Sequence, residues 1–181
     1  LRGTSTHRHA EGVTVSSEHT YQVNGLPIPK DLRPQHEHAI ERLRELYAMM
    51  FGVPDERVDL KNWTSTGSFS VRSCGTAACA VGWATEYPPF IEQGLRMGDG
   101  QPEFGRRTNW GAVHTFFGIG DEVGSYLFCV GSQWNPFALK CEGRGKSDKK
   151  QVLQRIRTVL LAWHVITKER SDELATQEEA L

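Results

Sequence analysis

The stretch Cys74-Gly-Thr-Ala-Ala-Cys-Ala-Val-Gly-Trp-Ala84 says more about the fold of this chain than any other part of the sequence. Its residues after Thr76 are small and mostly apolar, which is typical of a buried helix that neighbouring backbone approaches closely. Thr76 is a good N-cap residue and Pro88-Pro89 interrupts helices, so we expect one helix between them. The thiols of Cys74 and Cys79 then lie at or near the helix start, where N–H groups and the macrodipole favour negative charge.

Apolar residues recur at three- and four-residue spacing on both sides of this stretch, which predicts four further helices. These helices are expected from after Pro34 to Gly52, from Trp110 to Gly118, from Asp121 to Phe128 and from Ser147 to Ile166. The glycine-rich segment between Phe90 and Arg107 is expected to be a loop or a short hairpin. The sequence therefore predicts a mainly α fold, a single compact helical domain of about five helices over residues 34–168.

The two ends of the chain differ in composition from this predicted domain. Residues 1–33 are polar and lack a hydrophobic period, so we expect an extended N-terminal arm that contacts neighbouring subunits. Residues 169–181 are acidic, and we expect them to form a frayed tail.

Composition excludes several classes of function. The 21 Lys and Arg nearly balance the 22 Asp and Glu, so the net charge favours neither nucleic acid nor an acidic partner. No apolar run approaches the roughly 18 residues of a membrane span, and no signal-peptide core is visible. We expect a protein of the virion or of the host cytoplasm, with neither a membrane partner nor a cofactor.

The cysteine-containing stretch also permits nucleophilic chemistry. Cys74-Gly-Thr76 resembles the start of the central helix of papain-like cysteine hydrolases, which implies Cys74 as nucleophile. Such an enzyme needs a histidine base, and His114 is the candidate on a predicted core helix. Ala77-Ala78-Cys79 departs from the papain-like pattern, and no strand-rich half is visible.

Three other interpretations of the cysteines stay open, including a disulfide between two of the four if the protein lies outside a cell. A zinc ion is one, with His114 as a possible substitute ligand and a cysteine set of Cys74, Cys79, Cys129 and Cys141. These four lack the paired Cys-x2-Cys spacing of common zinc sites. Core packing is the interpretation that we favour, above all for Cys79, because free cysteine behaves as a small hydrophobe.

Two motifs resemble those of uncharacterised small proteins of bacteria and their phages. The first is Cys-Gly-Thr-x-x-Cys-x-x-Gly-(His or Trp), here residues 74–83, and the second is a Phe-Phe-Gly-Leu-like turn, here Phe116-Phe-Gly-Ile119. An acidic helix start at Asp121-Glu122 and a Leu127-Phe128 end complete the resemblance, which covers about residues 60–165. The family has no established activity, so the resemblance implies a phage or bacterial origin and no reaction.

A basic cluster offers the best, though weak, site for an anion or nucleic acid. Its members are Lys140, Arg144, Lys146, Lys149 and Lys150. Glu142 and Asp148 interrupt the cluster and no aromatic residues alternate with it, so a solvated helix face is the simpler interpretation.

From these observations we expect a non-enzymatic assembly or interaction protein of phage origin, such as a capsid-associated virion component. Its partners would be copies of itself or other assembly subunits, reached by the N-terminal arm. Two alternatives remain, a cysteine-dependent hydrolase or transferase using Cys74 and His114, and a phage inhibitor of a host system.

Overall fold

Seven α-helices and two small antiparallel sheets make up the described part of the chain in this computed structural model. The described residues are 13–15, 21–23, 26–29, 33–60, 63, 77–128 and 145–180. The expectation of a mainly α protein is confirmed. None of the helices within the described ranges is long and apolar enough to cross a membrane.

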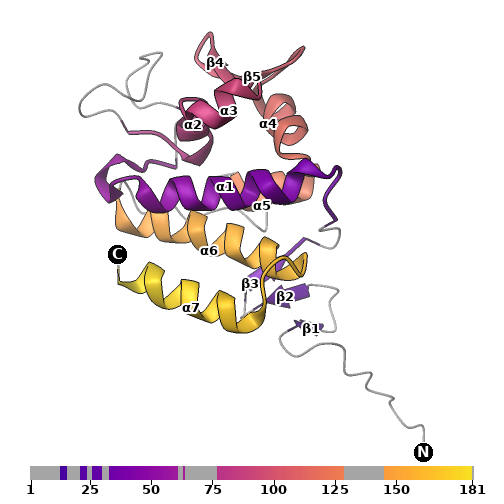
Figure 1. Ribbon diagram of the computed structural model, residues 1–181, viewed down its shortest axis with the longest axis vertical. Coiled ribbons are helices and arrows are strands. Elements are labelled where there is room, and N and C mark those ends of the chain that lie inside the picture. Colours follow the sequence, from indigo (N-terminus) through magenta and orange to yellow (C-terminus); the bar gives the residue numbers. More distant parts are fainter. Residues whose placement is uncertain are drawn as a thin grey trace, which may run out of the picture.

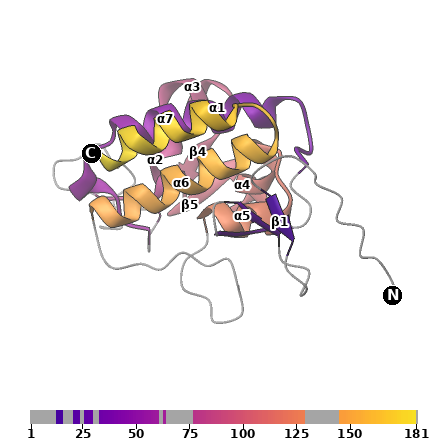
Figure 2. The same cartoon turned by 90° about the horizontal axis from the view of Figure 1, so that it is seen from below.

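Three helices form successive rows, α1 (His38–Gly52), α6 (Lys146–Ala162) and α7 (Lys168–Glu179) (Figure 1). Helix α1 packs against α6, and α6 packs against α7. In the view turned by 90°, α6 and α7 lie side by side (Figure 2). The buried residues of α1 and α6 recur every three or four positions, so each helix turns an apolar stripe toward the core. These stripes include Leu43, Leu46 and Met50 of α1 and Val152, Ile156 and Val159 of α6.

Helices α4 (Asn109–Phe117) and α5 (Asp121–Phe128) agree with the sequence prediction. Gly118 ends α4 with a φ of 60°, a left-handed conformation that glycine adopts without strain. Phe116 and Phe117 at the end of α4 pack on Phe90, with ring centroids 5.2 and 5.8 Å from it. These three rings belong to the same hydrophobic core as the buried residues of α1 and α6.

The helix expected between Thr76 and Pro88 is present but shorter, as α2 (Ala80–Ala84), and a further short helix that was not expected, α3 (Pro88–Glu92), begins at Pro88. Cys79 is the N-cap of α2, and Pro88 starts α3 because proline suits the first helical turn. Gly82 is the small residue of this segment that the backbone of Trp63 approaches closely. A Cβ atom there would lie 1.8 Å from the carbonyl oxygen of Trp63, so only glycine permits this approach.

Short strands form two separate meanders. The expected hairpin is present as β4 (Arg96–Gly98) and β5 (Gln101–Phe104), extended by β6 (Arg107–Thr108). A second sheet lies within the predicted arm, with the order β1 (Val13–Val15), β2 (Tyr21–Val23) and β3 (Leu26–Ile28). Strands of three residues are too short for alternation to reveal them, so the sequence did not predict this sheet.

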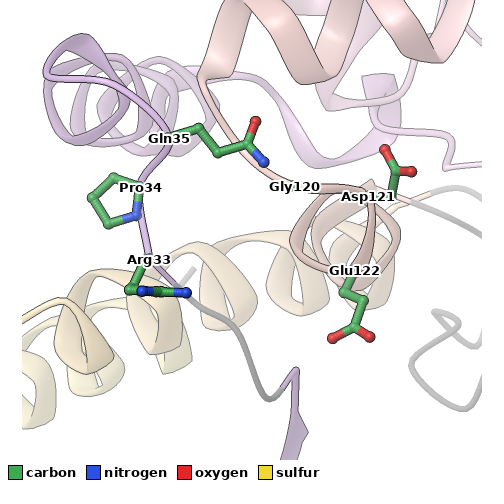
Figure 3. A pocket seen from close by; sticks show the side chains of 6 residues that line it. All are labelled: Arg33, Pro34, Gln35, Gly120, Asp121 and Glu122. Carbon is green, nitrogen blue, oxygen red and sulfur yellow. The ribbon is translucent and has the colours of Figure 1, made fainter.

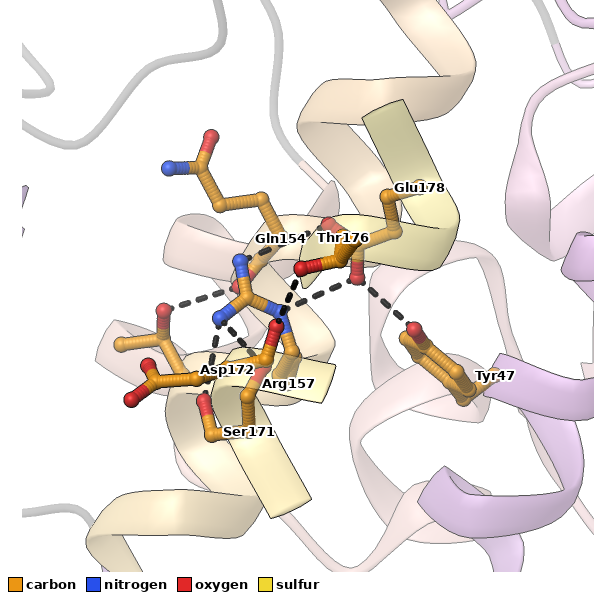
Figure 4. A network of polar contacts seen from close by, with 8 residues as sticks. Tyr47, Gln154, Arg157, Ser171, Asp172, Thr176 and Glu178 are labelled. Carbon is orange, nitrogen blue, oxygen red and sulfur yellow. Dashed lines mark hydrogen bonds and ion pairs between the residues drawn. The ribbon is translucent and has the colours of Figure 1, made fainter. Parts of the chain in front are cut away.

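Helix α7 replaces the frayed tail that we expected after Lys168. The residues that it buries fully are polar, namely Ser171 and Glu178. Glu178 Oε1 accepts hydrogen bonds from Arg157 Nε at 3.0 Å and from the Tyr47 hydroxyl at 2.7 Å (Figure 4). Arg157 Nη1 also donates to the Ser171 hydroxyl at 3.0 Å. Charge-assisted hydrogen bonds therefore tie α7 to both α6 and α1.

Glu178→Ala is expected to lower the free energy of unfolding by about 3 kcal/mol, because it leaves the Arg157 guanidinium buried without its carboxylate. Glu179→Ala, at the neighbouring exposed position, is the matched control and should change that free energy by less than about 0.5 kcal/mol. Urea denaturation followed by circular dichroism measures both values. Equal effects of the two substitutions would contradict the assigned role of the Arg157–Glu178 pair.

Candidate functional site

The hydrolase hypothesis needs Cys74 and His114, and the structure describes only His114. Cys74 lies outside the described residues, and His114 lies on α4, where its side chain is 18% exposed. His114 Nδ1 is 2.8 Å from Asp121 Oδ1, the kind of contact that orients a catalytic histidine. A Cβ atom on Gly124 would lie 2.3 Å from Nε2, so the opposite edge of the ring packs on the backbone of α5. In this arrangement both ring nitrogens face α5, and His114 serves as a contact between α4 and α5.

Cys79 behaves as the core residue that we expected. Its side chain is 7% exposed, and its Sγ accepts a hydrogen bond from the Gly82 N–H at 3.5 Å, which caps α2. Burial raises the pKa of the thiol to about 11, so the thiol stays protonated at neutral pH. A protonated, buried thiol is a poor nucleophile.

The zinc hypothesis gains no support from the part of the chain that the structure describes. Cys129 and Cys141 lie, like Cys74, outside those residues. Among the described residues no three His, Cys, Asp or Glu side chains gather in a way that could hold a metal ion.

One predicted member of the basic cluster, Lys149, is buried. Lys149 is 4% exposed, and its Nζ donates to the Val53 carbonyl at 2.7 Å and lies 3.2 Å from Asp55 Oδ1. It fastens α6 to the segment after α1, so it is unavailable to an external anion. Lys146 is exposed and Lys150 is half-buried, whereas Lys140 and Arg144 lie outside the described residues.

A shallow pocket of about 540 Å³ lies where the start of α1 meets the start of α5 (Figure 3). It is lined by Arg33, Pro34, Gln35, Gly120, Asp121 and Glu122. One cation, Arg33, and two carboxylates, Asp121 and Glu122, share the opening, so the cation offsets only one of the two negative charges. The Gln35 N–H donates to the Gly118 carbonyl at 2.7 Å, which makes the junction a contact between elements of the fold.

A second hollow, of about 470 Å³, lies between the end of α1 and the turn from α2 to α3. We call it the aromatic groove, and its lining residues are Ala48, Met49, Gly52, Val53, Pro54, Arg57, Trp83, Glu86, Tyr87 and Pro88. The side chains of Met49, Trp83 and Tyr87 are half-buried, so each packs on the core and also presents apolar surface to solvent.

The aromatic side chains of this groove are held in place. The Arg57 guanidinium carbon lies 4.6 Å from the centroid of the Trp83 ring, a cation–π contact. Trp83 Nε1 donates to the Arg57 carbonyl at 3.0 Å, which satisfies the polar atom of the indole. The Tyr87 ring packs edge-to-face on Phe90 of the core at 5.1 Å. The groove therefore presents a preformed apolar surface and needs little ordering to bind.

The sequence did not predict this groove. Trp83 belongs to the motif of residues 74–83, and Tyr87 belongs to no motif. The available signal was their four-residue spacing directly before Pro88-Pro89, which places two aromatic residues on one side of a helix end. That pattern is equally typical of a buried helix face, so it does not distinguish a groove from a core.

Cys79 should react with iodoacetamide only when the protein unfolds. With a pKa of about 11, about one thiol in a thousand is ionised at pH 8, and burial further blocks the reagent. Peptide mapping by mass spectrometry after timed alkylation measures the labelling, with the urea-denatured chain as the control. Labelling of Cys79 at the same rate in the native and the denatured protein would show that the thiol is accessible.

Comparisons of the chain with protein-family models, with curated proteins and with solved structures found no match. The resemblance to the small phage and bacterial proteins therefore stays a prediction.

Proposed function

We propose that this chain is a non-enzymatic interaction subunit that binds a protein partner in the aromatic groove. This is the assembly role expected from the sequence, in a phage virion, with copies of the chain or other assembly subunits as partners. The observation that carries the proposal is the set of residue types in one groove. Trp, Tyr, Arg and Met are the types enriched at the centres of protein interfaces.

The charges of the groove favour a partner that binds through shape and apolar contact. Arg57 and Glu86 contribute one positive and one negative side chain to the lining, so the groove carries no strong net field. An apolar side chain of the partner would contact Met49, Trp83 and Tyr87 and remove their exposed surface from water. Burial of such area contributes roughly 25 cal/mol per Å², which is the main source of affinity at interfaces of this kind.

Ala48→Glu tests the groove without removing any core contact. Ala48 is exposed on α1 and lines the groove, and glutamate is a good helix former, so the variant should fold normally. The added side chain would project into the groove and place a carboxylate against its apolar wall. The probe is a set of peptides selected from a random displayed library on the wild-type protein.

We expect the selected peptides to bind Ala48→Glu at least about tenfold more weakly than wild type, as measured by calorimetry. Ile91→Glu is the matched control because Ile91 is 42% exposed on α3 and lies outside the lining of the groove. Peptides that bind Ala48→Glu as tightly as wild type, or that respond only to Ile91→Glu, would refute the groove as the binding site.

A further inference from the structure

The turn between α6 and α7 ends a helix at a residue that is poorly suited to the task. Val165 N–H donates to the Leu160 carbonyl and His164 N–H to the Leu161 carbonyl, both at 2.9 Å, the pattern of a Schellman motif. The motif requires a left-handed residue, and His164 adopts it with a φ of 57°. Glycine normally occupies this position because any side chain there is strained.

The sequence around this turn also favours continuation of the helix. Residues 163–167 are Trp-His-Val-Ile-Thr and contain neither glycine nor proline. The apolar period of α6 runs on through Trp163 and Ile166, which is why the sequence predicted a helix to Ile166 although α6 ends at Ala162. The stop signal that the turn does contain is Thr167, whose hydroxyl accepts from the Arg170 N–H at 3.2 Å and caps α7. Bent and straight forms of this connection therefore compete.

The surface that α7 covers needs an acidic helix as its partner, whether the connection between α6 and α7 is bent or straight. The Arg157 side chain is 7% exposed and its carboxylate partner, Glu178, is 4% exposed. If the connection straightened, Arg157 would lose Glu178 and Ser171 and remain buried without a counter-charge, which is unfavourable. The α7 of a second copy carries the same Glu178 and Ser171 at the same spacing, so it fits this surface without any new contact.

We propose that this chain forms a dimer by exchange of α7, with His164 as the hinge and with Arg157 of each copy bound to Glu178 of the other. Exchange of an identical element is a low-cost route to a dimer because every contact of the closed monomer is reproduced. When α7 is exchanged, His164 of each copy leaves its left-handed conformation. This proposal is independent of the aromatic groove, since none of the residues that carry it lines that groove.

Substitutions at His164 test the hinge because its side chain is exposed. His164→Gly removes the strain of the closed turn and should favour the monomer. His164→Ala keeps the strain and favours a straight helix, so it should favour the dimer. The strain at one hinge changes the dimer dissociation constant by about tenfold. A dimer has two hinges, so this constant should differ by about a hundredfold between the two variants.

Sedimentation equilibrium of the full chain, after incubation at high concentration near its melting temperature, measures this constant. A tighter dimer for His164→Ala than for His164→Gly is the expected result. Equal constants, or two variants that remain monomeric throughout, would overturn the proposal.

Charge exchange at the Arg157–Glu178 pair tests the contacts themselves. Arg157→Glu and Glu178→Arg each place two like charges together within one chain. In an exchanged heterodimer of the two variants, both pairs are opposite in charge again. We expect the two variants, refolded together from urea, to give a 1:1 heterodimer by native mass spectrometry, whereas neither variant alone dimerises. Absence of the heterodimer, or equal dimerisation of either variant alone, would contradict the exchange.

Discussion

The packing of α1 against α6 is the interaction on which the other contacts of this structure depend. One face of α1 contributes Leu43, Leu46 and Met50 to the core, and α6 brings Val152 and Ile156 to the same core. Four of the other described α-helices each pack on one of these two. Helices α2 and α4 pack on α1, while α5 and α7 pack on α6. The end of α1 also provides a wall of the aromatic groove, so the proposed binding surface inherits its rigidity from this pair of helices.

Buried polar side chains, in addition to the apolar stripes, determine which elements pack on α1 and α6. Arg157, Lys149 and Tyr47 are all buried on or beside the α1–α6 pair, and each has a defined oxygen partner. Burying a charge is unfavourable unless it is paired, so these groups select the elements that can satisfy them. Asp55 and the Val53 carbonyl satisfy Lys149, and Glu178 satisfies Arg157 and Tyr47. In this way a helix as hydrophilic as α7 has a unique place on the molecule.

The difference between local apolar patterns and contacts between distant residues explains which features could be predicted from the sequence. Helices α1, α4 and α5 were predicted correctly because their apolar period and their stop residues, such as Gly118, are local signals. The burial of Lys149 and the docking of α7 depend on partners far away in the chain, so no local pattern contains them. The close approach of the Trp63 carbonyl to Gly82 is also a tertiary contact. Trp83 and Tyr87 look like core residues in sequence, and only the fold leaves them half-exposed in a groove.

We infer that α1 and α6 form the stable core of this protein, whereas α7 is a separable element held by Arg157. Amide hydrogen exchange of the native protein tests it most directly, because exchange reports the free energy of each local opening. We predict that buried amides of α1 and α6 exchange only through global unfolding, and that those of α7 exchange through an opening of lower free energy. Identical opening free energies for α6 and α7 would contradict the claim.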